Sequence, residues 1–347
     1  MDDDVLTAAI DDLASGKDLS RERTADVLAH IMDGGATDVQ IAAVLIALRT
    51  KGETEEELAG LATTMRAFAT PVATGREDLV DTAGTGGGRR TFNVSTTAAL
   101  IAAGAGCAVA KHGNRSATGL SGSADLLEAL GARIDLSAEQ VAQCIADVGF
   151  GFMFAPAHHR ATRFVVPVRK ALAVRTIFNV LGPLTNPAGA RRQLIGVSDP
   201  ALVDRMAGAL AALGCDRSLV VSSADGLDEL STSGVTHVVE VNSEQIERYD
   251  LSPADVGLDD AAYEDVVGGD PVENAAIARA ILTGERGAPR DLAVFNAGAA
   301  IYAAGRAGSI VDGVRAAEQA VDDGSAAATL KRFTTLSVDL AGGTDPA

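Results

Sequence analysis

The residues best suited to chemistry begin with a glycine-rich run between an apolar segment and an Ala-rich helical pattern. Four glycines fill five positions at residues 84–88, directly after the apolar residues 79–82. A turn between strand and helix presents backbone N–H groups to an anion, and glycine permits both close approach and positive φ. Arg89 stands where a dinucleotide fingerprint needs its third glycine, and no Gly-Lys-Ser/Thr of a P-loop follows. The run therefore predicts a phosphate-binding loop of another kind, or a tight turn without a ligand.

A second cluster of donors occupies residues 111–115, which read Lys-His-Gly-Asn-Arg and follow the apolar residues 107–110. Ligands of open α/β sheets bind along the C-terminal edge of the strands, so this segment suits an anionic substrate. Residues 121–125 precede another helical pattern, whose N-terminus is also suited to an anion. Alone, His112 is equally compatible with an ordinary histidine and Lys111 with a solvated charge. Together they favour a binding role.

Asp228 and Glu229 form an acidic pair after the apolar residues 219–222. Carboxylates that face a bound di- or triphosphate are suited to Mg²⁺, which prefers oxygen ligands and substrate phosphates. Without the two preceding segments, the pair reads as surface charge. With them, the residues predict a Mg²⁺-dependent enzyme that acts on a phosphorylated substrate.

Two further features are ambiguous. Arg169 lies in an interrupted helical segment, residues 163–187, and is placed either on the surface or against a substrate carboxylate, which a guanidinium binds bidentately. His158 and His159 are adjacent, but neighbouring side chains diverge and no third ligand has suitable spacing. We interpret this pair as structural.

The composition restricts the class of protein. The 347 residues are 47% hydrophobic and 22% charged, and their net charge of −18 opposes binding to nucleic acid. An acidic, lysine-poor chain suits a salt-rich cytoplasm, so we expect a halophilic protein. Three widely spaced cysteines without metal-like spacing indicate a reducing compartment. No signal peptide or membrane span is predicted, and we expect a cytoplasmic protein.

The periodicity predicts an α/β protein with a small all-helical domain and a large domain whose central sheet is mainly parallel and flanked by helices. Capping boxes at Thr37 and Thr54 start two of four early helices. We assign residues 1–72 and 163–189 to the helical domain and residues 73–162 and 190–347 to the α/β domain. The expected strands are residues 79–82, 108–111, 132–136, 150–154, 194–197, 218–222 and 235–241.

These motifs together resemble anthranilate phosphoribosyltransferase, a family of the nucleoside phosphorylase-like class in tryptophan biosynthesis. The resemblance covers nearly the whole chain in order, and it rests on residues 84–87, 91–96, 111–115, 121–125 and 175–187. It implies a glycosyltransferase that moves phosphoribose from phosphoribosyl pyrophosphate (PRPP) to the amine of anthranilate and releases pyrophosphate. It also implies a homodimer joined through the helical domains.

The resemblance implies roles for individual residues. The PRPP site would comprise Gly84, Gly87, Gly88, Thr91, Asn93, Val94, Ser95, Thr96, Lys111, His112, Gly113, Asn114, Arg115, Ser116, Ala117, Thr118, Gly119 and Ser123. The anthranilate site would comprise Gly84, His112, Asn114, Arg169 and Gly182. Two Mg²⁺ ions per subunit would be held by Ser95, Asp228 and Glu229. No catalytic acid or base is assigned, because an aromatic amine is neutral at pH 7.

The chain departs from the family pattern in its first loop. Gly88-Arg89-Arg90 replaces an aspartate that the family usually carries, and Leu120 ends a stretch that often contains a lysine. We hypothesise that Arg89 or Arg90 replaces the lost charge. Two alternatives are a pyrimidine nucleoside phosphorylase-like enzyme and a non-enzymatic nucleic-acid-binding paralogue. The net charge opposes the second.

Overall fold

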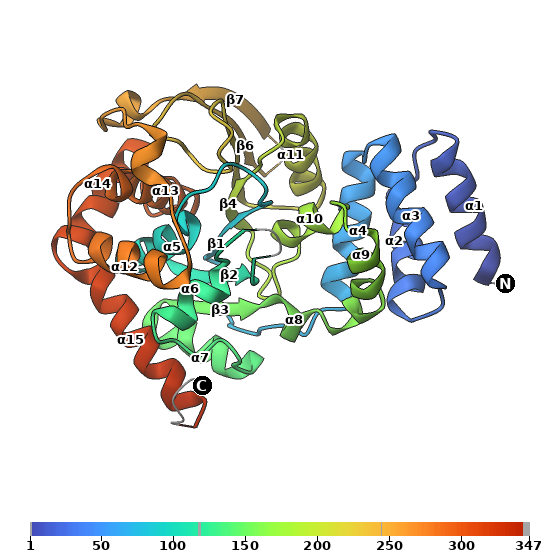
Figure 1. The fold of residues 1–347 in the computed structure, drawn as a ribbon, viewed down its shortest axis with the longest axis horizontal. Coiled ribbons are helices and arrows are strands. Elements are labelled where there is room, and N and C mark those ends of the chain that lie inside the picture. Colours follow the sequence, from blue (N-terminus) through green and yellow to red (C-terminus); the bar gives the residue numbers. More distant parts are fainter. Residues whose placement is uncertain (1, 117–118, 244, 343–347) are drawn as a thin grey trace.

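The computed structural model describes residues 2–116, 119–243 and 245–342, and its first part is a bundle of helices (Figure 1). Thr37 and Thr54 each accept a backbone N–H from the third residue of their helix, which confirms both capping boxes. Ser20 caps its helix in the same way through Arg23. The helices are α1 (Asp2–Ala14), α2 (Arg21–Met32), α3 (Asp38–Lys51) and α4 (Glu55–Ala67).

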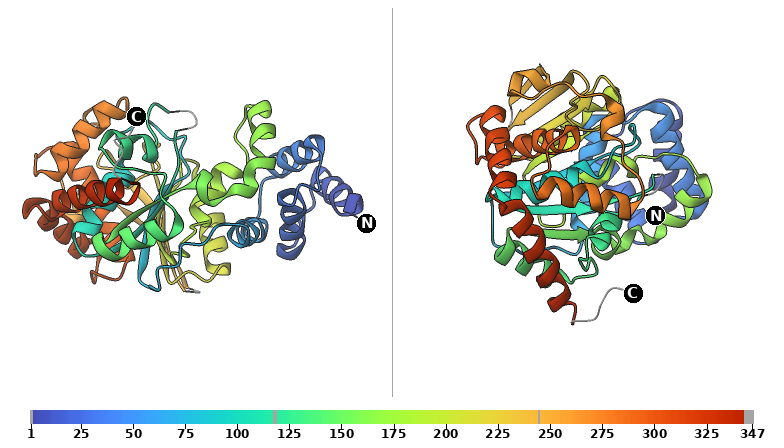
Figure 2. Two further views of the ribbon diagram at one scale, coloured as in Figure 1. Left: turned by 90° about the horizontal axis from the view of Figure 1, so that it is seen from below. Right: turned by 60° about the vertical axis from the view of Figure 1, so that its left-hand side comes forward.

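A later segment returns to this bundle, and the short helix α8 (Ala155–His158) leads into it. It contains the 3₁₀-helix η1 (Arg160–Phe164), α9 (Val166–Leu172), α10 (Phe178–Leu181) and η2 (Gly182–Leu184). Val165, Val168 and Ile177 are buried in the same apolar cluster as Ile41 and Leu45 of α3. Both views in Figure 2 show α9 beside the N-terminal helices. The domain boundaries expected from the sequence remain a prediction.

The central sheet has seven strands in the described residues, in the order β3-β2-β1-β4-β5-β6-β7. The first five in this order are parallel, and β5–β6 and β6–β7 are antiparallel. This confirms the predicted fold class. The strands are β1 (Leu79–Gly84), β2 (Ala108–Gly113), β3 (Phe150–Phe154), β4 (Arg192–Gly196), β5 (Arg217–Ser223), β6 (Thr236–Asn242) and β7 (Gln245–Leu251).

The strand prediction was wrong in two places. Residues 132–136 are not a strand, because their backbone bonds to neighbouring segments: Arg133 N–H donates to the Ser337 hydroxyl at 3.1 Å, and Ala132 N–H donates to Leu127. β7 was missed, because none of its side chains is fully buried and an apolar run is therefore absent. It is the edge strand beside β6.

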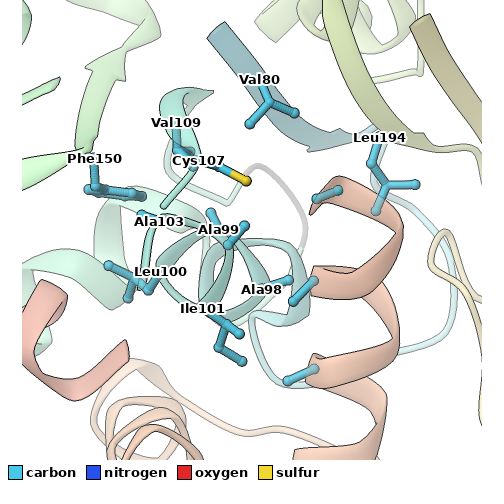
Figure 3. Packing of buried hydrophobic residues seen from close by; sticks show 14 of the residues in the cluster. Val80, Ala98, Ala99, Leu100, Ile101, Ala103, Cys107, Val109, Phe150 and Leu194 are labelled. Carbon is cyan, nitrogen blue, oxygen red and sulfur yellow. The ribbon is translucent and has the colours of Figure 1, made fainter. Parts of the chain in front are cut away.

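Helices cover both faces of the sheet. One cluster joins α5 (Val94–Gly104) to α7 (Ala138–Val148), α12 (Pro271–Leu282), α13 (Ala288–Ala303), α14 (Ile310–Asp322) and α15 (Ser325–Leu340). Side chains alternate along β5, where Leu219 faces this cluster and Val220 faces the cluster of α11 (Val203–Ala212) and the bundle. Figure 3 shows Ala98 and Ala99 of α5 near Val80 and Leu194 of the sheet, where small side chains permit close packing. No helix in the described ranges is long and apolar enough to cross a membrane.

Candidate active site

The candidate site lies where the chain order of the sheet reverses. β1 is flanked by β2 on one side and by β4 on the other, so the loops that follow β1 and β4 leave in different directions. Such a switch point opens a crevice at the carboxyl ends of the strands. The two loops contact each other: Thr85 N–H donates to the Gly196 carbonyl at 2.9 Å, and the Ser198 hydroxyl donates to the Gly86 carbonyl at 2.9 Å.

The acidic pair lies directly against the glycine-rich loop. The backbone N–H of Gly86 donates to Asp228 Oδ2 at 2.9 Å. A Cβ at Gly84 would lie 2.8 Å from the same oxygen, and one at Gly88 would lie 2.9 Å from Asp228 Oδ1. Gly86 and Gly87 have φ of 64° and 88°, a region that favours glycine. The glycines therefore serve both the turn and the close approach of a carboxylate.

Electrostatics around this pair favour a cation. Burial raises the pKa of Asp228, and burial together with the neighbouring Asp228 raises the pKa of Glu229 well above its usual range. Burial lowers the pKa of Lys111, opposed by the nearby Asp81 and Glu229. The Lys111 ammonium donates to the Thr82 carbonyl and lies 3.4 Å from the Ser95 hydroxyl. The charge of Lys111 therefore partly offsets that of Glu229, and Arg175 acts in the same way on Asp228.

The donor set fits Mg²⁺ held partly by substrate. Asp228 and Glu229 are adjacent, half-buried and mutually repelling. Within the described ranges, no group of three or more His, Cys, Asp or Glu side chains forms a complete metal cage. Mg²⁺ characteristically takes one or two carboxylates and completes its shell with water and phosphate oxygens. Ser95, in the first turn of α5, is near both Lys111 and Glu229.

The end of β2 is fixed by a buried acid that the sequence patterns did not single out. Asp81 accepts the His112 backbone N–H at 3.1 Å and the Asn186 amide at 2.7 Å. His112 Nδ1 donates to the Gly182 carbonyl at 3.1 Å, and its buried Nε2 has no protein partner. Burial lowers the pKa of His112 to about 3, so the ring is neutral. The sequence did contain a signal for this role, because Asp81 is an acid within an apolar strand and acids are rarely buried without a partner.

The loop after β2 is stabilised largely by its own helix, α6 (Ser123–Ala129). The Arg115 guanidinium bonds to Glu128 and Asp125, and these bonds raise its pKa. Asp125 also accepts the backbone N–H of Ser116. The predicted residues Ala117 and Thr118 lie outside the described residues. Gly119 N–H donates to the Ser116 hydroxyl.

Asn93 ties three loops together. Its side chain donates to the Ser121 carbonyl at 3.1 Å and accepts from the Ser121 hydroxyl and the Asn274 amide. Asn274 in turn accepts the Gly269 N–H at 2.8 Å. This side chain is therefore engaged by protein, and Asn274 is a loop partner that the sequence patterns did not indicate.

Arg169 lies in α9, in the segment that returns to the helical bundle. Its Nη2 lies 3.5 Å from Asn179 Oδ1, and its guanidinium carbon lies 5.4 Å from the centroid of the Phe178 ring. Burial lowers the pKa of Arg169. Arg175 reaches further towards the glycine-rich loop: its Nη2 donates to the Thr85 carbonyl at 3.2 Å, and its guanidinium occupies the place of a Gly87 Cβ. Arg175 begins one of the family motifs in the sequence, but nothing in its spacing indicated this contact.

The structure brings many of the predicted residues together at one edge. Residues linked by hydrogen bonds, charge or close approach around the acidic pair are Gly84, Gly88, Ser95, Lys111, Asp228 and Glu229. His112 and Gly182 form a second pair, and Gly87 contacts Arg175. Val94 and Thr96 are buried in the first turn of α5, and Thr91 is in the preceding loop. Gly113 packs against Ser123, whereas Asn114 bonds only to its own loop and helix α6 among the described contacts.

Comparison with known proteins places this architecture in a class. A family model described as "Glycosyl transferase family, helical bundle domain" matches residues 7–69, and "Glycosyl transferase family, a/b domain" matches residues 76–327. The protein is therefore a glycosyl transferase-family chain with both parts of that architecture.

Individual relatives define the family within this class. Anthranilate phosphoribosyltransferase of Rubrobacter xylanophilus is 53% identical over 340 residues, which are 97% of this chain and 99% of the relative. The crystal structure of the Thermus thermophilus enzyme is 45% identical, with a TM-score of 0.90 over 94% of this chain and 98% of that one. The Saccharomyces cerevisiae enzyme in complex with PRPP and Mg is 28% identical, with a TM-score of 0.87 over 96% and 98%.

The chain belongs to the anthranilate phosphoribosyltransferase family. This confirms the resemblance inferred from the motifs. The phosphorylase-like and nucleic-acid-binding alternatives are not favoured.

Proposed function

We propose that this protein transfers the phosphoribosyl group of PRPP to the amine of anthranilate, forming N-(5-phosphoribosyl)anthranilate and pyrophosphate in tryptophan biosynthesis. The bond from ribose C1 to the pyrophosphate oxygen breaks, a bond from C1 to the amine nitrogen forms, and the amine loses one proton. The observation that carries the proposal is the contact between the glycine-rich loop and Asp228, in a chain that shares its fold and family with the enzymes named above.

The pyrophosphate end of PRPP is assigned to the carboxyl edge of β1. Asp228, Glu229 and Ser95 would hold Mg²⁺, which supplies charge stabilisation for the departing pyrophosphate. The backbone N–H groups of the glycine-rich loop and the N-terminus of α5 favour an anion there. Lys111 adds a positive charge 3.4 Å from the Ser95 hydroxyl. We assign these roles from position, and two ions per subunit remain part of the proposal.

We assign the remaining residues of the proposed PRPP site to the loops near this edge. They are Gly84, Gly87, Gly88, Thr91, Asn93, Val94, Thr96, His112, Gly113, Asn114, Arg115, Ser116, Gly119 and Ser123, with Ala117 and Thr118 outside the described residues. Because Asn93 and Arg115 are engaged by protein groups, we expect them to act chiefly by shaping the loops.

The anthranilate end is assigned to the opposite wall. A guanidinium pairs bidentately with a carboxylate, and Arg169 is half-buried and has no carboxylate partner within the described ranges. We therefore assign the anthranilate carboxylate to Arg169, with Gly84, His112, Asn114 and Gly182 completing the pocket. The His112 ring is neutral, and because its Nε2 is buried we assign it to the wall of the pocket and give it no hydrogen bond to the amine.

No strong base is required for this reaction. The aromatic amine attacks as a neutral nucleophile, and C1 becomes cationic as pyrophosphate departs. The protein contributes by holding the amine and C1 in line, and positioning of this kind can supply much of the rate enhancement. The amine proton then leaves to water or transiently to the site's acceptors.

A single assay tests the activity. The protein is mixed with PRPP, anthranilate and MgCl₂ at low and high salt, and anthranilate fluorescence is followed. We expect Mg²⁺-dependent loss of the signal, with one pyrophosphate formed per anthranilate consumed. Stable fluorescence at every salt concentration would refute the proposed function. Phosphorolysis of a pyrimidine nucleoside in its place would favour the phosphorylase alternative.

We propose a homodimer joined through the helical bundles. One outer face of α3 carries Val39 (79% exposed) and Ile46 (37%), seven residues apart, with the smaller Ala42 and Ala43 between them. α1 adds Val5 (41% exposed). Sedimentation equilibrium tests this: a dimer is expected for the native chain, and Val39→Glu with Ile46→Glu should give a monomer.

Two properties of the environment are proposed from composition. The net charge of −18 is consistent with a salt-dependent, halophilic protein, so the midpoint of thermal unfolding should rise between low salt and molar KCl. The described Cys107, Cys144 and Cys215 are free and buried, which is consistent with a reducing, cytoplasmic location. A stability maximum at low salt would contradict the first proposal.

A further inference from the structure

Arg89, which lies in the part of the glycine-rich loop that departs from the family pattern, has a definite location. Its guanidinium carbon lies 3.4 Å from the centroid of the Tyr263 ring, a cation–π distance. Its backbone N–H donates to the Gly226 carbonyl at 3.0 Å, and its side chain reaches the Asp225 carbonyl at 3.4 Å. One residue thus contacts both the turn before Asp228 and the 3₁₀-helix η5 (Tyr263–Val266).

Tyr263 holds the next residue of the loop as well. Its hydroxyl donates to the Arg90 carbonyl at 2.8 Å. Further along, the Phe92 N–H donates to the Val266 carbonyl at 3.4 Å, and Gly268 lies so close to the Phe92 backbone that a Cβ would clash. Residues 89–92 therefore run alongside residues 263–268, and Tyr263 joins them through its ring face and its hydroxyl.

These contacts bear on the position of Asp228. The carboxylate is held by the Gly86 N–H, three residues before Arg89, and Gly226 is two residues before Asp228. Arg89 therefore joins the two segments on which this carboxylate depends. Gly86, Gly87 and Arg89 are exposed, so few buried contacts hold this part of the loop. Within the described ranges no carboxylate lies within ion-pair distance of Arg89, so its specific partners are the ring and two carbonyl groups.

We propose that Arg89 and Tyr263 are positioning residues for the Mg²⁺–pyrophosphate site. They clamp the glycine-rich loop against the acidic turn and thereby fix Asp228, and Arg89 does not itself contact phosphate. This inference deepens the proposed function and rests on it. It assigns a use to the Gly88-Arg89-Arg90 sequence that differs from the hypothesis of charge replacement.

A set of variants separates the clamp from a direct phosphate contact. Arg89→Ala and Tyr263→Leu each remove the contact between the guanidinium and the ring. The double variant removes the same single contact. Tyr263→Phe keeps the ring and removes only the hydroxyl bond. Arg90→Ala is the matched control, because it removes the same charge from the next position, where the contact with Tyr263 uses only the backbone carbonyl.

The measurement is the Kd of inorganic pyrophosphate in the presence of Mg²⁺, determined by calorimetry. We expect Arg89→Ala and Tyr263→Leu each to weaken binding by about two- to fivefold, the effect of losing one exposed cation–π contact. The double variant should show no further loss, since contacting residues are not additive. Arg90→Ala should retain wild-type affinity. Weaker binding in Arg89→Ala with unchanged binding in Tyr263→Leu would instead establish a direct phosphate contact and overturn the clamp.

Tyrosine emission provides a readout that does not involve the substrate. The chain has no tryptophan and three tyrosines, and the hydroxyls of Tyr249 and Tyr302 both bond to Glu240. Unstacking Tyr263 should change the emission in Arg89→Ala, and Arg89→Ala should change nothing in a Tyr263→Phe background. Identical emission in Arg89→Ala and wild type would overturn the stack.

The experiments distinguish a failure of the clamp alone from a failure of the proposed function on which it rests. If the wild type does not consume anthranilate, the proposed function fails and the clamp fails with it. If the wild type is active, and Arg89→Ala and Tyr263→Leu are folded by thermal melting yet bind pyrophosphate normally, only the clamp is refuted.

Discussion

The backbone N–H of Gly86 and the carboxylate of Asp228 are joined by a hydrogen bond of 2.9 Å, although 142 residues separate them in the chain. The bond requires no side chain from the loop and leaves the second carboxylate oxygen available to a cation. Gly84 and Gly88 approach the same carboxylate, and neither has room for a Cβ. The glycine-rich loop therefore positions the carboxylate that we propose as a metal ligand, in addition to the role in phosphate binding that we propose for its N–H groups.

Two glycine substitutions separate these roles. A Cβ at Gly88 would lie 2.8 Å from the Gly226 carbonyl oxygen and 2.9 Å from Asp228 Oδ1, so Gly88→Ala should displace the acid and raise the Mg²⁺ concentration for half-maximal rate about tenfold. At Gly86 a Cβ meets nothing, but φ is 64°, so Gly86→Ala should lower the free energy of unfolding by about 1 kcal/mol. Magnesium titrations and denaturant melts of both variants test this. Equal Mg²⁺ dependence would contradict it.

The buried acidic pair should lower the stability of the fold at neutral pH. A carboxyl whose pKa is raised by folding binds protons more readily in the folded state, so its contribution to stability decreases as pH rises from its unfolded pKa towards its folded pKa. Burial and Asp228 raise the pKa of Glu229 well above its usual range. Glu229→Gln should therefore melt at a higher temperature than wild type at pH 7.5 without Mg²⁺, and the difference should shrink towards pH 4.

The same variant should lose Mg²⁺-dependent rate, and so should Asp228→Asn, because each removes an anionic oxygen ligand. We expect at least a roughly hundredfold loss for each. The measurement is kcat across a Mg²⁺ titration, with Glu285→Gln, an exposed acid on the α12–α13 connection, as control. Unchanged turnover when both acids are altered would remove them from the metal site.

The sequence indicated many of the residues that lie together in this candidate site, because the patterns that mark them are local. Glycine runs, a Lys-His-Gly-Asn-Arg segment and adjacent acids are visible as patterns, and parallel strands necessarily place their ends at one edge. The contacts between them are not local. Asp81 and Asn186 are 105 residues apart in sequence, and Asn93 and Asn274 are 181 residues apart. No spacing rule joins such distant pairs, and the same holds for the stack of Arg89 on Tyr263.

The strand prediction failed where the pattern of burial does not coincide with strand pairing. Residues 132–136 alternate in burial, but the Arg133 N–H bonds to Ser337, so no ladder forms. β7 has the opposite character: it pairs along its whole length with β6, yet much of it faces solvent. Apolar alternation reports burial and therefore misses an exposed edge strand.

Acid should destabilise the region around His112. Burial lowers the pKa of His112 to about 3 and that of His159 to about 4, and their ring centroids are 5.0 Å apart. A base with a lowered folded pKa contributes stability that is present above its unfolded pKa, near 6.5, and is lost as pH falls below it. His112→Asn retains an N–H for Gly182 and cannot titrate, so its melting temperature should fall less than that of wild type between pH 7 and pH 5.

Buried carboxyls and buried histidines change the stability of the fold in opposite directions as pH falls. The contribution of His112 must therefore be measured by comparing a variant with wild type. Raised carboxyl pKa values, as at Asp81, favour the folded state at acid pH, and lowered histidine pKa values oppose it. Parallel melting curves for His112→Asn and wild type across this range would show that His112 does not contribute.

Arg169 should govern affinity for one substrate only. Arg169→Ala should raise the KM for anthranilate at least about tenfold and leave the KM for PRPP within about twofold, because one buried charge-assisted contact is lost. Arg163→Ala is the matched control: this exposed arginine is in the same segment and stacks on Phe164 at 4.7 Å. An equal effect of Arg169→Ala on both KM values would refute its placement.

The connection between Arg169 and Arg175 contains a strained residue. Ala173 ends α9 with φ 53° and ψ 27°, a left-handed conformation that an L-residue with a Cβ adopts at a cost of about 1 kcal/mol. Ala173→Gly removes this strain but gains freedom in the unfolded chain, worth about 0.5–1 kcal/mol in the opposite direction. We therefore expect the free energy of unfolding to remain unchanged or to rise slightly. Ala8→Gly, at an exposed position inside α1, should lower it by about 1 kcal/mol. Denaturant melts compare the two variants, and an equal loss in both would show that Ala173 is unstrained.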